Sequence, residues 1–143
     1  MSSTAPPFAI QRIVCFALLL GMAAFAVVVA LVLQSNEGRG LAETRIEVLD
    51  TMAIAVGVAS ATGALVLRTI LNGKAAAAPP AERASARFVA TLVPLATLEG
   101  GCMLALTAWL LNGTMFPNLA VAGLLLTVAI VVVPFRNPDD GSS

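Results

Sequence analysis

The sequence has 143 residues, of which 59% are hydrophobic and only 11% are charged. A water-soluble domain usually carries about 25% charged residues because its surface must be solvated, so we expect much of this surface to face a lipid bilayer. The formal net charge is zero, which gives no electrostatic attraction to nucleic acid. Histidine, the commonest metal ligand and general base, is absent. We therefore expect no enzymatic activity, no cofactor and no metal site.

Four long apolar runs follow one another along the chain. A helix that crosses a bilayer needs ~20 mostly apolar residues, because its backbone polar groups must be satisfied within the segment. The sequence therefore predicts an all-α, polytopic membrane protein, a bundle of four transmembrane helices in a single membrane domain, 1–143. The expected helices are, in chain order, about 13–33, 51–71, 88–111 and 118–135.

The first expected helix, 13–33, carries no charge. It is longer than the roughly 7–15 apolar residues of a secretion signal, so we expect it to be retained. Cys15 in this helix and Cys102 in the third differ in depth by about 18 Å, which excludes a disulfide. Both are interpreted as small packing residues. The segment 34–50 mixes charges of both signs and is expected to be a solvated loop.

The second expected helix, 51–71, is rich in small residues. Because lipid tails are as apolar as leucine, membrane helices associate through the close packing of small residues. Such residues indicate a tight contact, either with another helix of this chain or with a partner in a homo-oligomer or larger membrane complex. Two rows at four-residue spacing are Ala53-Gly57-Ala61 and Ala55-Ala59-Gly63.

Glu99 lies at the centre of the third expected helix, 88–111, near the middle of the bilayer. An ionised acid costs at least ~2.5 kcal/mol there, and no basic residue is expected at this depth, so we expect a mostly protonated carboxyl group. Ser60, Thr62 and Thr127 are expected at nearly the same level. Two interpretations stay open: an ion- or proton-binding site completed by these hydroxyls, or a neutral hydrogen-bonding group that fixes the helix against its neighbours.

The end of the third helix carries Trp109, which we expect to anchor the chain at the membrane interface together with Arg68 and Arg87. The turn that follows begins with Asn112-Gly113 and ends with Pro117-Asn118, residues typical of a tight turn before a helix. The third and fourth helices are therefore expected to be antiparallel neighbours.

The basic residues predict the orientation of the chain. If four helices cross, six of the eight lie on one side: Arg12, Arg68, Lys74, Arg83, Arg87 and Arg136. Arg39 and Arg45 lie on the other side among four acidic residues. Basic loops stay in the cytoplasm, so both termini and the connection 72–87 are expected there. This connection is rich in alanine, contains two prolines and is expected to be a flexible link.

The run Leu95-Ala96-Thr97-Leu98-Glu99-Gly100-Gly101-Cys102-Met103-Leu104-Ala105-Leu106 resembles the carboxylate helix of the rotary ATPase c subunit (proteolipid), where small residues follow an acid. That resemblance implies that Glu99 is an ion-binding carboxylate. The whole chain also resembles small bacterial four-helix membrane proteins of unknown function, which share the Leu-Glu-Gly sequence found here at residues 98–100. This second resemblance implies a bacterial inner (cytoplasmic) membrane.

The residues favour a non-enzymatic structural or accessory subunit of the membrane. The expected partner is the lipid bilayer, with further copies or other membrane proteins as alternatives. One intramembrane acid without a second titratable group does not form a proton relay. The alternative function is that of a proteolipid-like subunit that carries protons or cations on Glu99.

Overall fold

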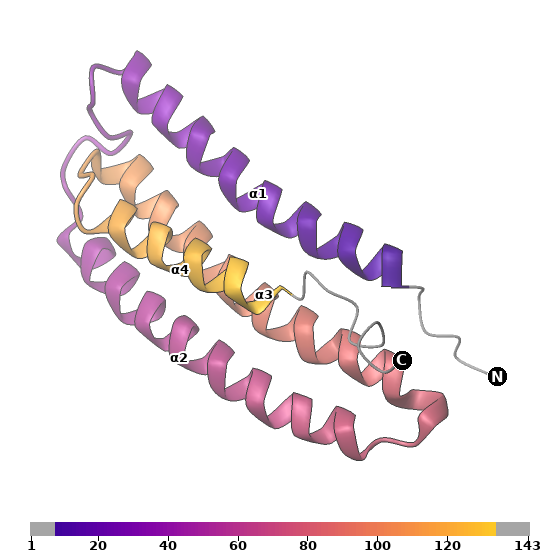
Figure 1. Cartoon of the computed structure of the whole chain (residues 1–143). Coiled ribbons are helices and arrows are strands. Elements are labelled where there is room, and N and C mark those ends of the chain that lie inside the picture. The colour runs from indigo at the N-terminus through magenta and orange to yellow at the C-terminus, as the bar shows by residue number, and fades with distance from the viewer. Residues whose placement is uncertain (1–7, 134–143) are drawn as a thin grey trace.

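A computed structural model describes residues 8–133, which form four α-helices (Figure 1). Three of the helices are long and apolar enough to cross a membrane, and the fourth is an apolar helix of 15 residues. The all-α class with four helices is confirmed. The expected end of the fourth helix at 135, together with Arg136, lies outside the described residues. The helices are α1 (Phe8–Ser35), α2 (Glu47–Ala77), α3 (Pro80–Asn112) and α4 (Asn118–Val132).

α3 is the central helix of the bundle, because it contacts each of the other three helices. Figure 1 shows α1 and α2 on opposite sides of the pair formed by α3 and α4. Consistent with this, α1 contacts α3 and α4 but not α2. A short turn joins α3 to α4, and the two helices pack against each other, as the residues of the turn predict.

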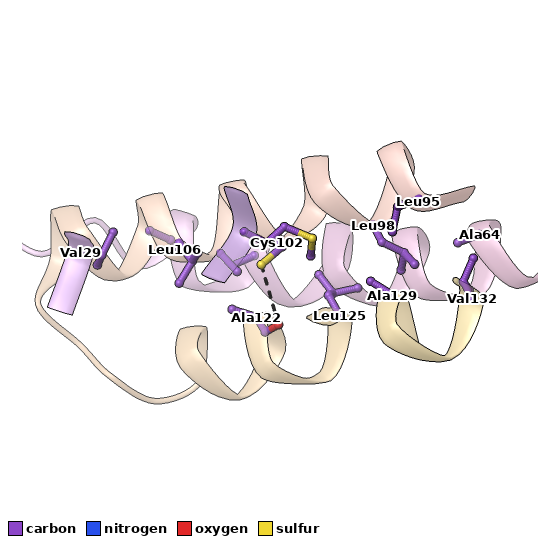
Figure 2. Close-up of a cluster of buried hydrophobic side chains, with 14 of the residues drawn as sticks. Val29, Ala64, Leu95, Leu98, Cys102, Leu106, Ala122, Leu125, Ala129 and Val132 are labelled. Carbon is purple, nitrogen blue, oxygen red and sulfur yellow. Dashed lines mark hydrogen bonds between the residues drawn. The ribbon is translucent and has the colours of Figure 1, made fainter. Parts of the chain in front are cut away.

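The apolar core receives side chains from all four helices (Figure 2). Leu98 and Leu106 of α3 are fully buried, and Leu125 of α4 packs in the same cluster. On α1 the buried residues Cys15, Met22 and Val29 recur every seven residues. Seven-residue spacing keeps one narrow stripe of a helix facing its neighbour, so most of the α1 surface faces outward.

The two small-residue rows of α2 have different environments. Ala53 and Gly57 are buried, and a Cβ atom at Gly57 would meet Cγ1 of Val121 on α4. The row Ala55-Ala59-Gly63 lies on the outside, where a Cβ at Gly63 would meet nothing within 4 Å. The first row therefore packs within the chain, and the second is on its surface.

The connection 72–87 is helical along most of its length, which corrects the expected flexible link. α2 continues to Ala77 and α3 begins at Pro80, so only two residues separate the helices. Alanine has the highest helix propensity, which extends α2 through the alanine run. Proline is favoured at the first position of a helix, where a backbone N–H would lack a partner, so the second proline starts α3.

At the opposite end, part of the expected solvated loop is bonded to α3. The N–H groups of Leu41 and Ala42 donate to the carbonyls of Leu110 and Leu111, each at 3.0 Å. Carbonyls in the last turn of a helix lack intrahelical partners, so the loop satisfies them. The backbones approach closely here, because a Cβ at Gly113 would clash with the N atom of Gly40.

Two glycines test this close approach. Gly38 and Gly113 both have positive φ angles, 78° and 68°, but a Cβ at Gly38 would meet nothing within 4 Å. Gly38→Ala is expected to lower the free energy of unfolding by about 1 kcal/mol through backbone strain alone. Gly113→Ala adds the clash and is expected to cost about 3 kcal/mol. Unfolding by dodecyl sulfate in mixed micelles, followed by circular dichroism, measures both; equal losses would contradict the close approach.

Candidate functional site

Glu99 lies in the middle of α3 and is half-buried. Its carboxylate faces α1, because a Cβ atom placed on Gly21 would lie 3.9 Å from Oε1 of Glu99. Gly21 therefore lies beside the acid where α1 meets α3, and a Cβ atom there would be in ordinary van der Waals contact with the carboxylate. Among residues 8–133, Glu99 accepts no hydrogen bond and forms no ion pair.

The structure does not bring the three expected hydroxyl partners to Glu99. Ser60 is buried on α2, where its Oγ faces Gly101 of α3. Thr127 is exposed on α4, and its Oγ1 donates to a carbonyl of its own helix at 2.8 Å. Thr62 is exposed on α2. The carboxyl group and the three hydroxyls therefore do not form one cluster.

The rotation of α3 about its axis explains this separation. Successive residues of an α-helix are rotated by about 100°, so Glu99 and Gly101 lie on nearly opposite faces of α3. Ser60 of α2 packs on the Gly101 face, whereas Gly21 of α1 packs on the Glu99 face. The position of a residue in an apolar run gives its depth in the bilayer but not the neighbour that it faces.

A second polar site is centred on Asp50, in the first turn of α2. Asp50 is only 7% exposed, which corrects the expectation that it belongs to a solvated segment. Its Oδ1 accepts hydrogen bonds from the side-chain amides of Asn118 at 2.7 Å and Asn112 at 3.0 Å. Its Oδ2 accepts a hydrogen bond from Nη2 of Arg45 at 2.7 Å. The hydroxyl of Thr114 lies 3.4 Å from Oδ1.

We call these five residues the Asp50 cluster. It joins the start of α2 to both ends of the turn between α3 and α4, since Asn112 ends α3 and Asn118 begins α4. The first turn of a helix has partial positive charge, which favours an acid at this position. The carboxylate is therefore already surrounded by donors, and the arrangement is that of a structural connection rather than of a free base.

Asn112 extends the Asp50 cluster to the backbone before α2. Its Oδ1 accepts a hydrogen bond from the N–H of Ile46, and its Nδ2 donates to the carbonyl of Ile46, both at 3.0 Å. Asn118 is fully buried, and its Nδ2 also donates to the carbonyl of Thr114 at 3.3 Å. The Oδ1 of Asn118 has no partner among the described residues. Both carboxylate oxygens of Asp50 and both polar atoms of the Asn112 side chain are bonded within the chain.

A signal for the Asp50 cluster is present in the sequence. Asp50 immediately precedes an apolar run, Asn112 follows one, and Asn118 begins another. Polar residues at these ends share one depth when neighbouring helices are antiparallel. Taken one at a time they look like ordinary loop residues, which is why the site is not recognised without their spatial pairing.

The three expected interface anchors have different surroundings. Trp109 is partly buried and packs against the core. Arg68 of α2 donates from Nη1 to the carbonyl of Val131 on α4, at 3.4 Å. Arg87 lies exposed in the first half of α3. Their function as membrane anchors stays a prediction.

The two cysteines pack in the core. Both are free and buried, as expected for small packing residues, and Sγ of Cys102 lies 3.8 Å from the carbonyl oxygen of Ala122 (Figure 2). Within residues 8–133, no three His, Cys, Asp or Glu side chains are grouped so that they could hold a metal ion.

The chain matches no protein-family model, no curated protein and no solved structure. The likeness of the Glu99 helix to the rotary ATPase c subunit therefore stays a prediction. So does the likeness to small bacterial four-helix membrane proteins.

Proposed function

We propose that the protein is a multi-pass integral membrane protein with a structural or accessory, non-enzymatic role. The observation that carries this proposal is that the polar side chains around Asp50 bond the helices to one another. Asp50, which accepts more hydrogen bonds than any other acid among residues 8–133, connects α2, α3 and α4 to one another. The outer surfaces of α1 and α2 are mainly apolar and suit contact with lipid or with another membrane protein.

The proposed topology has four crossings in a bacterial inner membrane. α4 is the fourth crossing, and both termini and the tip between α2 and α3 lie in the cytoplasm. The distribution of basic residues supports this orientation. It is tested by attaching a membrane-impermeant thiol reagent to single cysteines at Ala78 and Glu37 in a chain without Cys15 and Cys102. Labelling of Ala78→Cys in intact cells would contradict the orientation.

A second candidate function is supported by Glu99. This acid has no hydrogen-bond partner among residues 8–133, although an acid inside a membrane usually pairs with another group or marks an ion path. In this alternative, Glu99 carries a proton or cation while it faces α1.

Glu99→Gln separates the two functions. Glutamine keeps the shape of the side chain and removes the proton that an acid exchanges. On the structural role, we expect the variant to fold, with unchanged proton flux in reconstituted vesicles. Loss of flux, together with pH-dependent labelling of Glu99 by dicyclohexylcarbodiimide, would establish the carrier instead. Glu47→Gln is the matched control, since Glu47 is exposed in the first turn of α2.

Native mass spectrometry of the protein released from its own membrane tests the same choice. An accessory subunit is expected in a complex that contains other proteins. A closed ring of identical copies would favour the carrier, whereas a persistent monomer would contradict both functions.

A further inference from the structure

Arg68 is a half-buried cation on α2 that uses few of its hydrogen-bond donors within the described part of the chain. A guanidinium group has five N–H donors. Among residues 8–133, Arg68 makes one hydrogen bond, the 3.4 Å contact from Nη1 to the carbonyl of Val131, and no carboxylate pairs with it. Exposed apolar side chains surround this position on α2, those of Leu65, Val66 and Ile70.

The depth of this guanidinium group follows from the helices that it connects. Asn118 is hydrogen-bonded to Asp50, so the beginnings of α4 and α2 share one level. The rise along α4 from Asn118 to Val131 is about 20 Å, and the rise along α2 from Asp50 to Arg68 is about 27 Å. Side chains on a helix lean toward its N-terminus. The Arg68 side chain accordingly reaches back to Val131, about 20 Å from the Asp50 level.

In a flat bilayer, the guanidinium group of Arg68 would lie within the hydrocarbon core. The hydrocarbon core is about 30 Å thick, so with the Asp50 cluster at one boundary, the opposite boundary lies about 10 Å beyond the guanidinium of Arg68. The bilayer relieves the cost of an arginine at such a depth by local thinning and by the entry of water and headgroups. Val131 is 66% exposed, so a lipid molecule can approach this face of α4.

We propose that Arg68 binds the phosphate group of a phospholipid that is drawn inward beside the end of α4. One N–H holds the carbonyl of Val131, and the remaining donors of the planar guanidinium match two phosphate oxygens. The leaflet is therefore thinned on the face formed by α2 and α4, while it keeps its full thickness beside α1. This site rests on the proposed crossing of the membrane.

Spin labels at two matched depths test the proposal. The full chain, with Cys15→Ala and Cys102→Ala, is labelled at Val131→Cys or at Leu20→Cys and reconstituted in dioleoylphosphatidylcholine vesicles. Leu20 of α1 is 70% exposed and adjoins Gly21, which faces Glu99. Glu99 lies about 20 Å from the end of α3, so the two labels sit at a similar depth. The rate at which each spin label collides with a water-soluble nickel complex is compared with the rate at which it collides with oxygen.

We expect nickel access to be several-fold higher at Val131 than at Leu20. In Arg68→Leu, nickel access at Val131 is expected to fall to the value at Leu20. In Arg68→Lys, which keeps the charge, nickel access at Val131 is expected to stay high. The label at Val131 is also expected to enhance the relaxation of lipid phosphorus. Equal access at both positions, or no effect of Arg68→Leu, would overturn the site. Nickel access without phosphorus relaxation would assign water in place of the phosphate. High access at Leu20 as well would instead refute the membrane crossing.

Discussion

Asp50→Ala is expected to lower the free energy of unfolding by about 3 kcal/mol, because it removes an acceptor that holds three helices together. Hydrogen bonds to a charged group contribute roughly 1.5–3 kcal/mol each, and buried donors left unpaired add a further cost. Part of this loss of stability is offset in the variant. The side chain of Arg45 is 55% exposed and can be hydrated, while Asn112 and Asn118 keep their backbone acceptors. Unfolding by dodecyl sulfate in mixed micelles, followed by Trp109 fluorescence, measures the loss.

Glu47→Ala is the matched control for Asp50→Ala. Glu47 also lies in the first turn of α2 but is exposed, so only its interaction with the helix terminus is lost, about 0.5 kcal/mol. Equal losses in the two variants would show that the Asp50 cluster does not stabilise the fold. A double-mutant cycle between Asp50 and Asn118, whose side chains are 2.7 Å apart, is expected to give a coupling of about 1–2 kcal/mol.

The helices are largely predictable, because each long apolar run is expected to form a helix that crosses the membrane. The runs beginning at residues 13, 51, 88 and 118 correspond to α1, α2, α3 and α4. Their ends differ for a local reason. The apolar run stops where the membrane is expected to stop, whereas the helix stops where backbone hydrogen bonding stops. α2 accordingly continues through polar and alanine residues to Ala77.

The candidate sites are less predictable, because they depend on how each helix is rotated. Glu99 stands out in the sequence as an acid in an apolar run, and its depth relative to Ser60 follows from counting residues. That it faces Gly21 and not Ser60 depends on which side of α3 receives α2. The Asp50 cluster requires pairing across more than sixty positions of sequence, which no local pattern contains.

These two sites are built in opposite ways. Asp50 accepts hydrogen bonds from the loop before α2, from the end of α3 and from the start of α4. It therefore fixes the geometry of one end of the bundle. Glu99 lies where α1 packs by a narrow stripe and accepts no hydrogen bond within residues 8–133. Substitutions at Asp50 are therefore expected to act on stability. Glu99→Gln is expected to change proton flux only if the second candidate function, the carrier, is the correct one.

Gly101→Ala is expected to lower the free energy of unfolding by about 3 kcal/mol, the upper part of the range for an overpacked core. A Cβ atom at this position would lie 2.6 Å from Oγ and 2.9 Å from Cβ of Ser60, and 3.1 Å from Cδ1 of Leu125. The contacts come from α2 and α4 at once, so α3 cannot move away from one helix without approaching the other. Unfolding by dodecyl sulfate, followed by circular dichroism, measures this loss.

The neighbouring residue supplies the control for Gly101→Ala. A Cβ at Gly100 would meet nothing within 4 Å, and alanine favours the helix over glycine, so Gly100→Ala is expected to stabilise by about 0.5–1 kcal/mol. Ser60→Gly removes both of the closest atoms and is expected to restore much of the stability lost in Gly101→Ala. Ser60→Ala leaves the 2.9 Å contact in place and should restore less. If Gly100→Ala and Gly101→Ala behaved alike, or if Ser60→Gly gave no rescue, α2 would not pack against α3 at Gly101.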